Sequence, residues 1–321
     1  MCVRRKENPM KTTNHRRQPA GFTVIELMMV FVIIALLLAM SASAFNAAVA
    51  QSKISRTKVI IAKLDQLVMD RYETYRTRPV PIRATDTIAS NNPQFARLAA
   101  RNRLNALRDI MRMELPHARV DVTEPPIVAG LARPAVSRGY QRKTASVTWS
   151  DDWQSAECLY LIIASMRDGD KSALDFFSPE EIGDVDEDGV PEILDAWGQP
   201  IIFVRWAPGY SADSTEPAVS VQSRYTIDPV SREKTFNPDR FDLLKVDTRW
   251  NDMDQTNDPF DLKPLIFSMG PDKELAGIQV PDTSTSNLND PYRQVGGNYL
   301  GTILNATPVA DNITNHYQEA E

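Results

Sequence analysis

The sequence has few of the residues from which disulfide frameworks and catalytic sites are usually built. Its 321 residues include 2 cysteines and 3 histidines, too few for a disulfide framework. The sequence contains no recognisable Ser/His/Asp set, no metal-binding triad, no phosphate-binding loop and no internal repeat. Its apolar and charged fractions, 42% and 24%, are those of ordinary globular proteins. These absences argue against an enzyme and favour a structural or binding protein.

One long stretch lacks almost everything that would break or charge a helix. Residues 22–50 contain no glycine, no proline and no charged residue except Glu26. About 20 helical residues span a bilayer, so this stretch predicts a transmembrane segment. Apolar residues continue at helical spacing as far as Tyr75, and Pro79 is the first proline that follows. The pattern therefore predicts one long helix over residues 22–78.

Charge is distributed unevenly around the apolar segment. Residues 1–21 hold six basic residues and one acidic residue, Glu7, which gives a net charge of +5. Because the whole chain has a net charge of −6, residues 22–321 carry −11. Such a basic head predicts a cytoplasmic amino terminus, with the acidic body across the membrane. Two simpler interpretations are a plain membrane anchor and a secretory signal peptide cut after Ala44, since residues 42–44 form an A-x-A site.

Neither interpretation explains Glu26, because a charged side chain in a transmembrane helix costs about 2.5–3.5 kcal/mol. The sequence GFTVIELMMV, from Gly21 onward, resembles the processing site of type IV prepilins and type II secretion pseudopilins. The resemblance implies a leader of residues 1–21, which a prepilin peptidase removes by cleaving after Gly21. Phe22 then becomes the methylated amino terminus. Met1 and Met10 are both candidate translation starts.

The resemblance also gives Glu26 a role in assembly. An α-amino group is mostly cationic at neutral pH, so Glu26 of one subunit can pair with the Phe22 amine of its neighbour. Paired charges are tolerated where single ones are costly, and the pair would set the axial register of a filament. The alternative is that Glu26 neutralises the Phe22 amine of its own chain. Many relatives have a proline where this chain has Ser43, so no intrinsic kink is expected.

Beyond the helix, residues 79–321 read as an α+β head with a small antiparallel sheet. Periodicity and turn residues predict helices over residues 93–115 and 155–166, and strands over 201–206 and 264–268. Residues 124–146 show little periodicity and are expected to form a loop. Cys158 is expected to be a buried free thiol.

The first of these helices is strongly basic. Its arginines offer a possible nucleic-acid surface. The preferred interpretation is a solvated face that pairs with the acidic head. The arginines concerned are Arg97, Arg101, Arg103, Arg108 and Arg112.

The sequence DVDEDGVPEILD, residues 184–195, predicts a calcium loop. Aspartates at positions 1, 3 and 5 and Gly189 at position 6 match the spacing of such loops. Pro191 and an aspartate rather than a glutamate at position 12 depart from it. The alternatives are a solvated acidic turn and an Asp-capped helix start. The expected ligands are Asp184, Asp186, Asp188, the carbonyl of Val190, Glu192 and Asp195.

Two pieces of the carboxy-terminal half resemble the major pseudopilin. They are the Asp-Ala-Trp-Gly turn at residues 195–198 and the Ser-x-Gly-x-Asp loop at residues 268–272. In that family the second loop binds calcium, which implies a role for Asp272.

Together these features predict a membrane-anchored filament subunit without catalytic activity. Its expected partners are prepilin peptidase, other pilin or pseudopilin subunits and an inner-membrane assembly platform of a type II secretion or type IV pilus system. The resemblance implies one pass through the inner membrane, with the head in the periplasm. The alternatives are a competence-type DNA-binding pilin and a membrane-tethered or secreted enzyme.

Overall fold

The computed structural model describes residues 21–81, 93–211, 220–228, 230–250, 257–275, 277–305 and 311–316. The chain divides into two compact units, with the boundary between Val49 and Ala50. The leader predicted over residues 1–21 lies outside the described residues, apart from Gly21.

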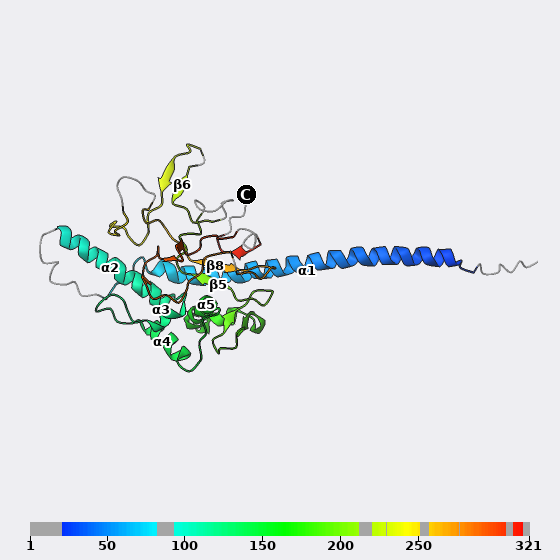
Figure 1. Ribbon diagram of the computed structural model, residues 1–321, viewed down its shortest axis with the longest axis horizontal. Helices are drawn as coiled ribbons and strands as arrows, with labels where there is room; N and C mark the ends of the chain where they lie inside the picture. The colour runs from blue at the N-terminus through cyan, green and yellow to red at the C-terminus, as the bar shows by residue number, and fades with distance from the viewer. Residues whose placement is uncertain are drawn as a thin grey trace, which may run out of the picture. The chain divides into compact units, whose positions relative to one another are not determined.

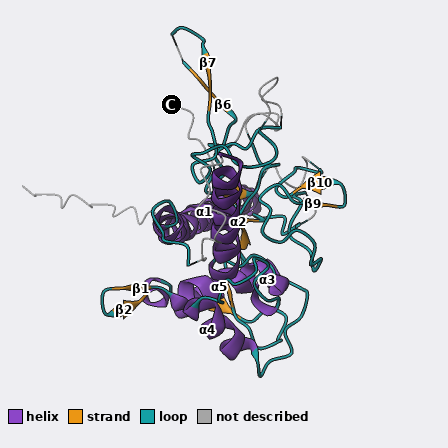
Figure 2. Ribbon diagram, turned by 90° about the vertical axis from the view of Figure 1, so that its left-hand side faces the viewer, coloured by secondary structure: helices purple, strands orange, loops and turns teal. Residues whose placement is uncertain are grey.

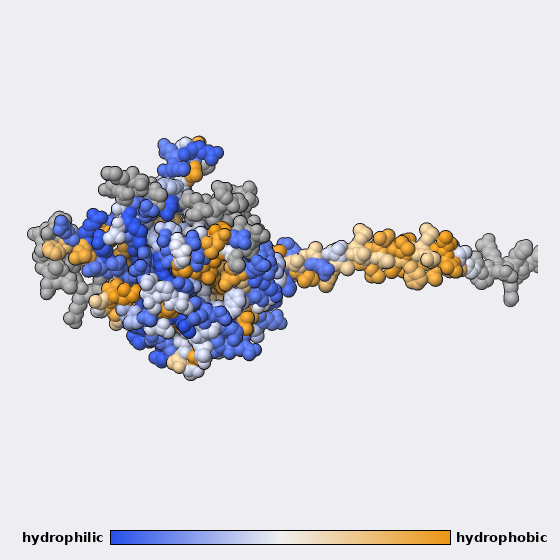
Figure 3. Space-filling view, viewed as in Figure 1, coloured by the Kyte–Doolittle hydropathy of each residue, from blue (hydrophilic) through white to orange (hydrophobic). Residues whose placement is uncertain are grey.

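The first unit is the amino-terminal part of helix α1 (Val24–Thr74), which confirms the predicted long apolar helix. Residues 21–49 are all exposed, and Figure 3 shows their surface to be almost wholly hydrophobic on the face in view. The helix is long and apolar enough to cross a membrane, which indicates membrane anchoring. It runs through Ser43 without interruption, and the Ser43 hydroxyl donates to the carbonyl of Met40 at 2.9 Å.

In the second unit, the rest of α1 is part of the core. Its buried face follows the helical spacing that the sequence predicts, and Tyr75 continues it just beyond the helix end. The phenol of Tyr72 donates to the carbonyl of Leu262 at 3.0 Å. The buried side chains of this face are Thr57, Ile60, Ile61, Leu64, Val68 and Tyr72.

Four further helices pack in this unit, and three of them gather in one region in Figure 2. The helices predicted over residues 93–115 and 155–166 are confirmed as α2 (Pro93–Glu114) and α5 (Gln154–Ser165). Between them lie α3 (Arg119–Thr123) and α4 (Ala135–Thr144). The prediction that residues 124–146 form a loop is therefore wrong. It fails because α4 buries only Ser137 and Tyr140, too few for a visible apolar period.

The central sheet has three antiparallel strands in the order β11–β8–β5, with β5 and β8 beside α1 and α5 in Figure 1. The two predicted strands are confirmed as β5 (Ile202–Val204) and β8 (Leu265–Ser268), paired so that Phe203 faces Ile266. The third strand is β11 (Ile313–Thr314). Four two-stranded ribbons are β1–β2 (Arg167–Asp168, Lys171–Ser172), β3–β4 (Ile182–Gly183, Glu192–Ile193), β6–β7 (Tyr225–Ile227, Lys234–Phe236) and β9–β10 (Gln294–Val295, Asn298–Tyr299). Two 3₁₀ turns, Ala173–Phe176 and Pro179–Glu181, precede β3.

The arginines of α2 do not all form the solvated face that the sequence predicts. Arg108 is buried and donates to Asp239 at 3.0 Å and to Asp247 at 2.5 Å. Arg101 donates to the carbonyl of Val246 at 3.0 Å. The acidic partners were expected, but burial was not. The cause is that residues 239–247 fold over α2 and remove these guanidinium groups from solvent.

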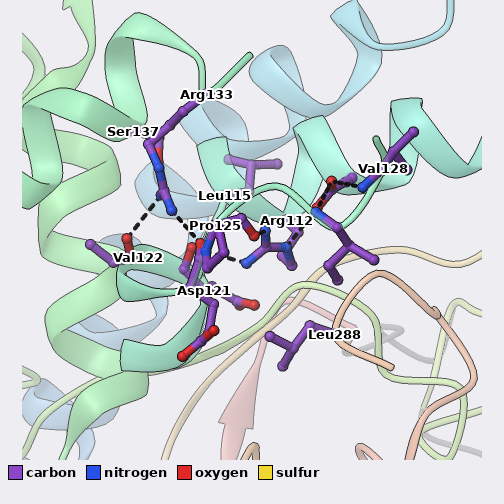
Figure 4. Close-up of polar contacts among 12 residues, drawn as sticks. Arg112, Leu115, Asp121, Val122, Pro125, Val128, Arg133, Ser137 and Leu288 are labelled. Atoms are coloured by element: carbon purple, nitrogen blue, oxygen red, sulfur yellow. Dashed lines mark hydrogen bonds and ion pairs between the residues drawn. The ribbon is translucent and has the colours of Figure 1, made fainter. Parts of the chain in front are cut away.

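Arg112 is also buried, at the point where α2 meets the segment before α4 (Figure 4). Its Nε donates to Asp109 at 2.8 Å, and its Nη2 donates to the carbonyl of Pro125 at 2.8 Å. The other oxygen of Asp109 accepts the N–H groups of Ile127 and Val128 at 2.7 and 3.0 Å. These bonds satisfy the backbone of an otherwise irregular segment.

Candidate functional site

The processing segment begins with a capping box at the start of α1. The N–H and the hydroxyl of Thr23 donate to Oε2 of Glu26 at 2.8 and 2.9 Å. In return, the N–H of Glu26 donates to Oγ1 of Thr23 at 3.3 Å. This reciprocal pattern is that of an S/T-x-x-E capping box. The spacing of Thr23 and Glu26 is its signal in the sequence and was not used to predict the start of the helix. Because both bonds go to Oε2, Oε1 of Glu26 has no partner within the described part of the chain.

Gly21 and Phe22 lie before this box and outside the helix. The Phe22 side chain is 83% exposed, and a Cβ added to Gly21 would meet nothing within 4 Å. The peptide bond between them is therefore sterically accessible at the amino-terminal edge of the apolar helix. Glu26 lies one turn further along, as the alternative of intrachain neutralisation requires.

The predicted calcium loop is the connection between β3 and β4. Asp184 accepts the N–H groups of Asp188 and Gly189 at 3.2 and 3.0 Å. Asp188 accepts those of Val190 and Ser150 at 2.8 and 2.5 Å. Gly189 adopts φ +97°, and a Cβ there would come within 2.9 Å of a Val147 methyl group, so glycine is required. The aspartates at positions 1 and 5 thus shape the loop through its backbone. One oxygen from each of Asp184, Asp186 and Asp188 nevertheless lies within 4.8 Å of the others, so the structure brings these three predicted ligands together.

Asp195 lies away from this loop, contrary to its predicted place at position 12. Its Oδ1 accepts the N–H groups of Trp197 and Gln199 at 2.8 and 3.0 Å, and its Oδ2 accepts the Ser268 hydroxyl. The reason is that the chain enters β4 at Glu192, so Asp195 caps the turn after that strand. Val190 has a buried side chain, and its N–H is the donor to Asp188.

A different set of carboxylates comes together beneath the loop. Oxygens of Glu157, Asp186 and Glu192 all lie within 4.8 Å of one another. Each residue has one oxygen bonded to the protein: Glu157 accepts the Trp149 indole N–H, Asp186 the Ser150 hydroxyl at 2.6 Å, and Glu192 the Val185 N–H at 3.0 Å. The second oxygens, Glu157 Oε1, Asp186 Oδ1 and Glu192 Oε1, are buried without a partner.

The pKa values of this cluster reflect burial first and the nearby like charges second. Burial raises the pKa of Glu157 to about 9; the Trp149 hydrogen bond opposes the rise, and the charges of Asp188 and Asp186 add to it. Burial likewise raises the pKa of Glu192 to about 7, again with neighbouring aspartates adding to it. A site with this electrostatics favours a positive charge among the carboxylates.

The sequence analysis identified Asp186 and Glu192 but missed Glu157. Glu157 lies in α5 among buried apolar residues and is itself 0% exposed. An acid within an otherwise apolar buried helix is a usable signal, because such residues are almost never fully buried unless paired.

The loop that follows β8 brings Asp272 into contact with Asp311. The N–H of Asp272 donates to Oδ2 of Asp311 at 3.3 Å, and its Oδ1 accepts the N–H of Glu274 at 2.9 Å. Oδ1 of Asp311 and Oδ1 of Asn312 are buried without a partner. Asp272 itself is exposed.

Comparison with known proteins gives one match. The family model of the prokaryotic N-terminal methylation motif matches residues 16–42. No curated protein and no solved structure matches the chain. The motif and the long apolar helix that begins within it fit a type IV pilin-like or pseudopilin protein.

Proposed function

We propose that this protein is a structural subunit of a periplasmic filament in a type II secretion or type IV pilus system. The observation that carries the proposal is the methylation motif over residues 16–42, placed at the start of an apolar helix long enough to cross a membrane. In this proposal prepilin peptidase cleaves after Gly21 and Phe22 becomes the amino terminus. The subunit then remains anchored in the inner membrane, with its head in the periplasm, until an assembly platform incorporates it into the filament.

Glu26 has a defined part in this function. Its Oε2 is engaged by Thr23 of the same chain, whereas Oε1 is left without a described partner. One carboxylate can thus cap its own helix and still accept the Phe22 amine of a neighbouring subunit. In an apolar surrounding this pairing stabilises both charges and fixes the axial offset between adjacent helices.

The chemistry of the head supports a structural role rather than catalysis. His117 and His316 are buried, and burial lowers the pKa of each, that of His316 to about 4. Cys158 is a buried free cysteine whose thiol pKa is raised by burial, which makes it unreactive. The buried arginines of α2 are occupied by protein acceptors, which argues against the DNA-binding alternative. We also propose that the loop at residues 268–272 holds calcium through Asp272 and its neighbours.

Intact-mass and amino-terminal analysis of the protein from its native membranes tests the proposal. The expected mature chain starts at Phe22 and carries an added methyl group. Replacing Gly21 with leucine should leave the leader attached. A start at Phe45 would instead show cleavage of an ordinary signal peptide and overturn the proposal.

A further inference from the structure

We propose that Glu157, Asp186 and Glu192 hold a calcium ion between helix α5 and the β3–β4 loop. This site adds Glu157 of α5 to Asp186 and Glu192 of the ligand set that the sequence predicts. Oxygens of Asp184, Asp186 and Asp188 also lie within 4.8 Å of one another, but Asp184 is exposed, and Asp184 and Asp188 accept backbone N–H groups of the loop. It is also distinct from the loop that contains Asp272.

One oxygen from each of the three carboxylates lies at the spacing that a shared ion requires. Calcium binds oxygens at about 2.3–2.6 Å, so two oxygens on one ion are separated by at most roughly 5 Å. The cluster oxygens lie within 4.8 Å of one another. Glu157 and Glu192 are both 0% exposed, and each has an oxygen with no hydrogen-bond partner. Unpartnered buried carboxylate oxygens are costly, and one cation would satisfy all three.

The surroundings supply no other compensation. Within the described residues, none of the three carboxylates forms an ion pair with lysine, arginine or histidine. The candidate ligands are all carboxylate oxygens, which suit calcium and magnesium better than zinc. The loop that supplies Asp186 can adjust its geometry, which favours calcium over the stricter octahedral magnesium.

The oxygens already bonded to the protein point to preorganisation of the site. Trp149 holds one oxygen of Glu157, Ser150 holds one of Asp186, and the N–H of Val185 holds one of Glu192. Such outer contacts orient metal ligands. The remaining oxygen of each carboxylate is therefore left available for an ion.

The ion would fasten the loop to the core of the head. Helix α5 is joined to β5 by Ser155, which accepts the N–H of Phe203 at 3.1 Å and donates to its carbonyl. A cation shared by α5 and the β3–β4 loop extends this connection from the central sheet to the loop. Calcium that binds only the folded protein must also stabilise it.

Terbium luminescence tests the site in the full chain in detergent micelles. Trp149 donates its indole N–H to Glu157, so excitation of tryptophan should sensitise a terbium ion that replaces calcium there. We expect saturable emission that excess calcium removes, and that equal magnesium removes less well. Glu157→Gln should reduce calcium affinity by more than about tenfold and abolish the emission. Trp149→Phe should lose the emission but keep calcium binding in calorimetry.

Matched controls separate this site from the rest of the acidic loop. Glu187→Gln makes the same change at an exposed loop residue and should behave as wild type. Asp272→Asn alters the other proposed calcium loop and should leave the tryptophan-sensitised terbium emission at the wild-type level. Asp186→Asn, which keeps an acceptor for Ser150, should lose the ion even if Glu157→Gln fails to fold. Wild-type emission and calcium affinity in both Glu157→Gln and Asp186→Asn, or wild-type protein whose emission calcium does not displace, would overturn the proposal. Equal displacement by magnesium would overturn the calcium preference.

Discussion

The Ser268 hydroxyl donates to Oδ2 of Asp195 at 2.6 Å, and both residues are buried. Asp195 caps the turn that leads into β5, whereas Ser268 ends β8, the antiparallel neighbour of β5. Ser268 also accepts the N–H of Gly270 at 3.1 Å. One hydrogen bond therefore couples the turn entering one central strand to the loop leaving the other.

Replacing Asp195 with alanine should lower the free energy of unfolding by about 2–4 kcal/mol, because two turn N–H groups and a buried hydroxyl lose their acceptor. Denaturation of the full chain in micelles, followed by tryptophan fluorescence, measures the loss. Asp195→Asn keeps an acceptor for the turn and should cost clearly less. Equal losses in the two variants would show that the charge, not the turn, is what matters.

Arg108→Met should destabilise the protein by about 3–5 kcal/mol, since it leaves the buried carboxylate of Asp239 without its cation and leaves Asp247 paired with Arg249 alone. Arg103→Ala removes a charge from an exposed position of the same helix and should change stability by less than about 0.5 kcal/mol. The same denaturation measurement compares them. A small effect of Arg108→Met would mean that the ion pairs of Arg108 contribute little to the free energy of unfolding. Separately, a salt-sensitive loss of DNA binding in Arg103→Ala would favour a nucleic-acid surface on this helix.

His316 should make stability depend on pH between about 6.5 and 4. Burial lowers its pKa from the usual 6.5 to about 4. Over this range the unfolded chain binds a proton that the folded chain does not, so stability falls as pH falls, by up to roughly 3 kcal/mol at pH 4. His316→Gln keeps a donor for the carbonyl of Pro264, 3.0 Å from the native ring, but does not titrate. Between pH 6.5 and 4, the unfolding free energy of the wild type should fall relative to that of His316→Gln. If the two free energies change with pH in parallel, His316 is not the titrating group.

Glu26→Gln should separate the two roles of Glu26. Glutamine can still accept the bonds from Thr23 but carries no charge, so the variant should insert normally. It should enter filaments at least tenfold less efficiently, because a buried amine loses a partner worth more than 1.4 kcal/mol. Thr23→Val weakens the cap but keeps the charge, and should assemble. Sedimentation of filaments from cells measures both, and wild-type assembly of Glu26→Gln would show that the pair does not set the register.

The sequence predicts the parts of this protein whose periodicity is long or strongly apolar. Helix α1, helix α5 and strands β5 and β8 were predicted for that reason. Helix α4 was missed because two buried residues in ten do not make a readable pattern. Burial of Arg108 was missed because its acidic partners lie more than 130 residues away.

In the candidate metal site, too, local sequence patterns were readable and contacts that depend on packing were not. Spacing located Asp186 and Glu192, because neighbouring acids are visible in the sequence. Spacing counted Asp195 as a ligand, although backbone N–H groups and Ser268 occupy its oxygens. Glu157 was missed because its position beside the loop depends on the packing of α5. Only the fold shows which oxygens are already used.

Helix α1 is both the apolar membrane anchor and part of the core of the head, since it supplies buried side chains from Thr57 to Tyr72. A protease that cuts before Ala50 releases a head that retains all of them. A cut within residues 57–75 removes core side chains together with the anchor, so the shed fragment loses its packing. Within that stretch, detachment from the membrane and loss of the folded state are the same event, and the cell's clearance of unfolded chains would also remove the detached heads.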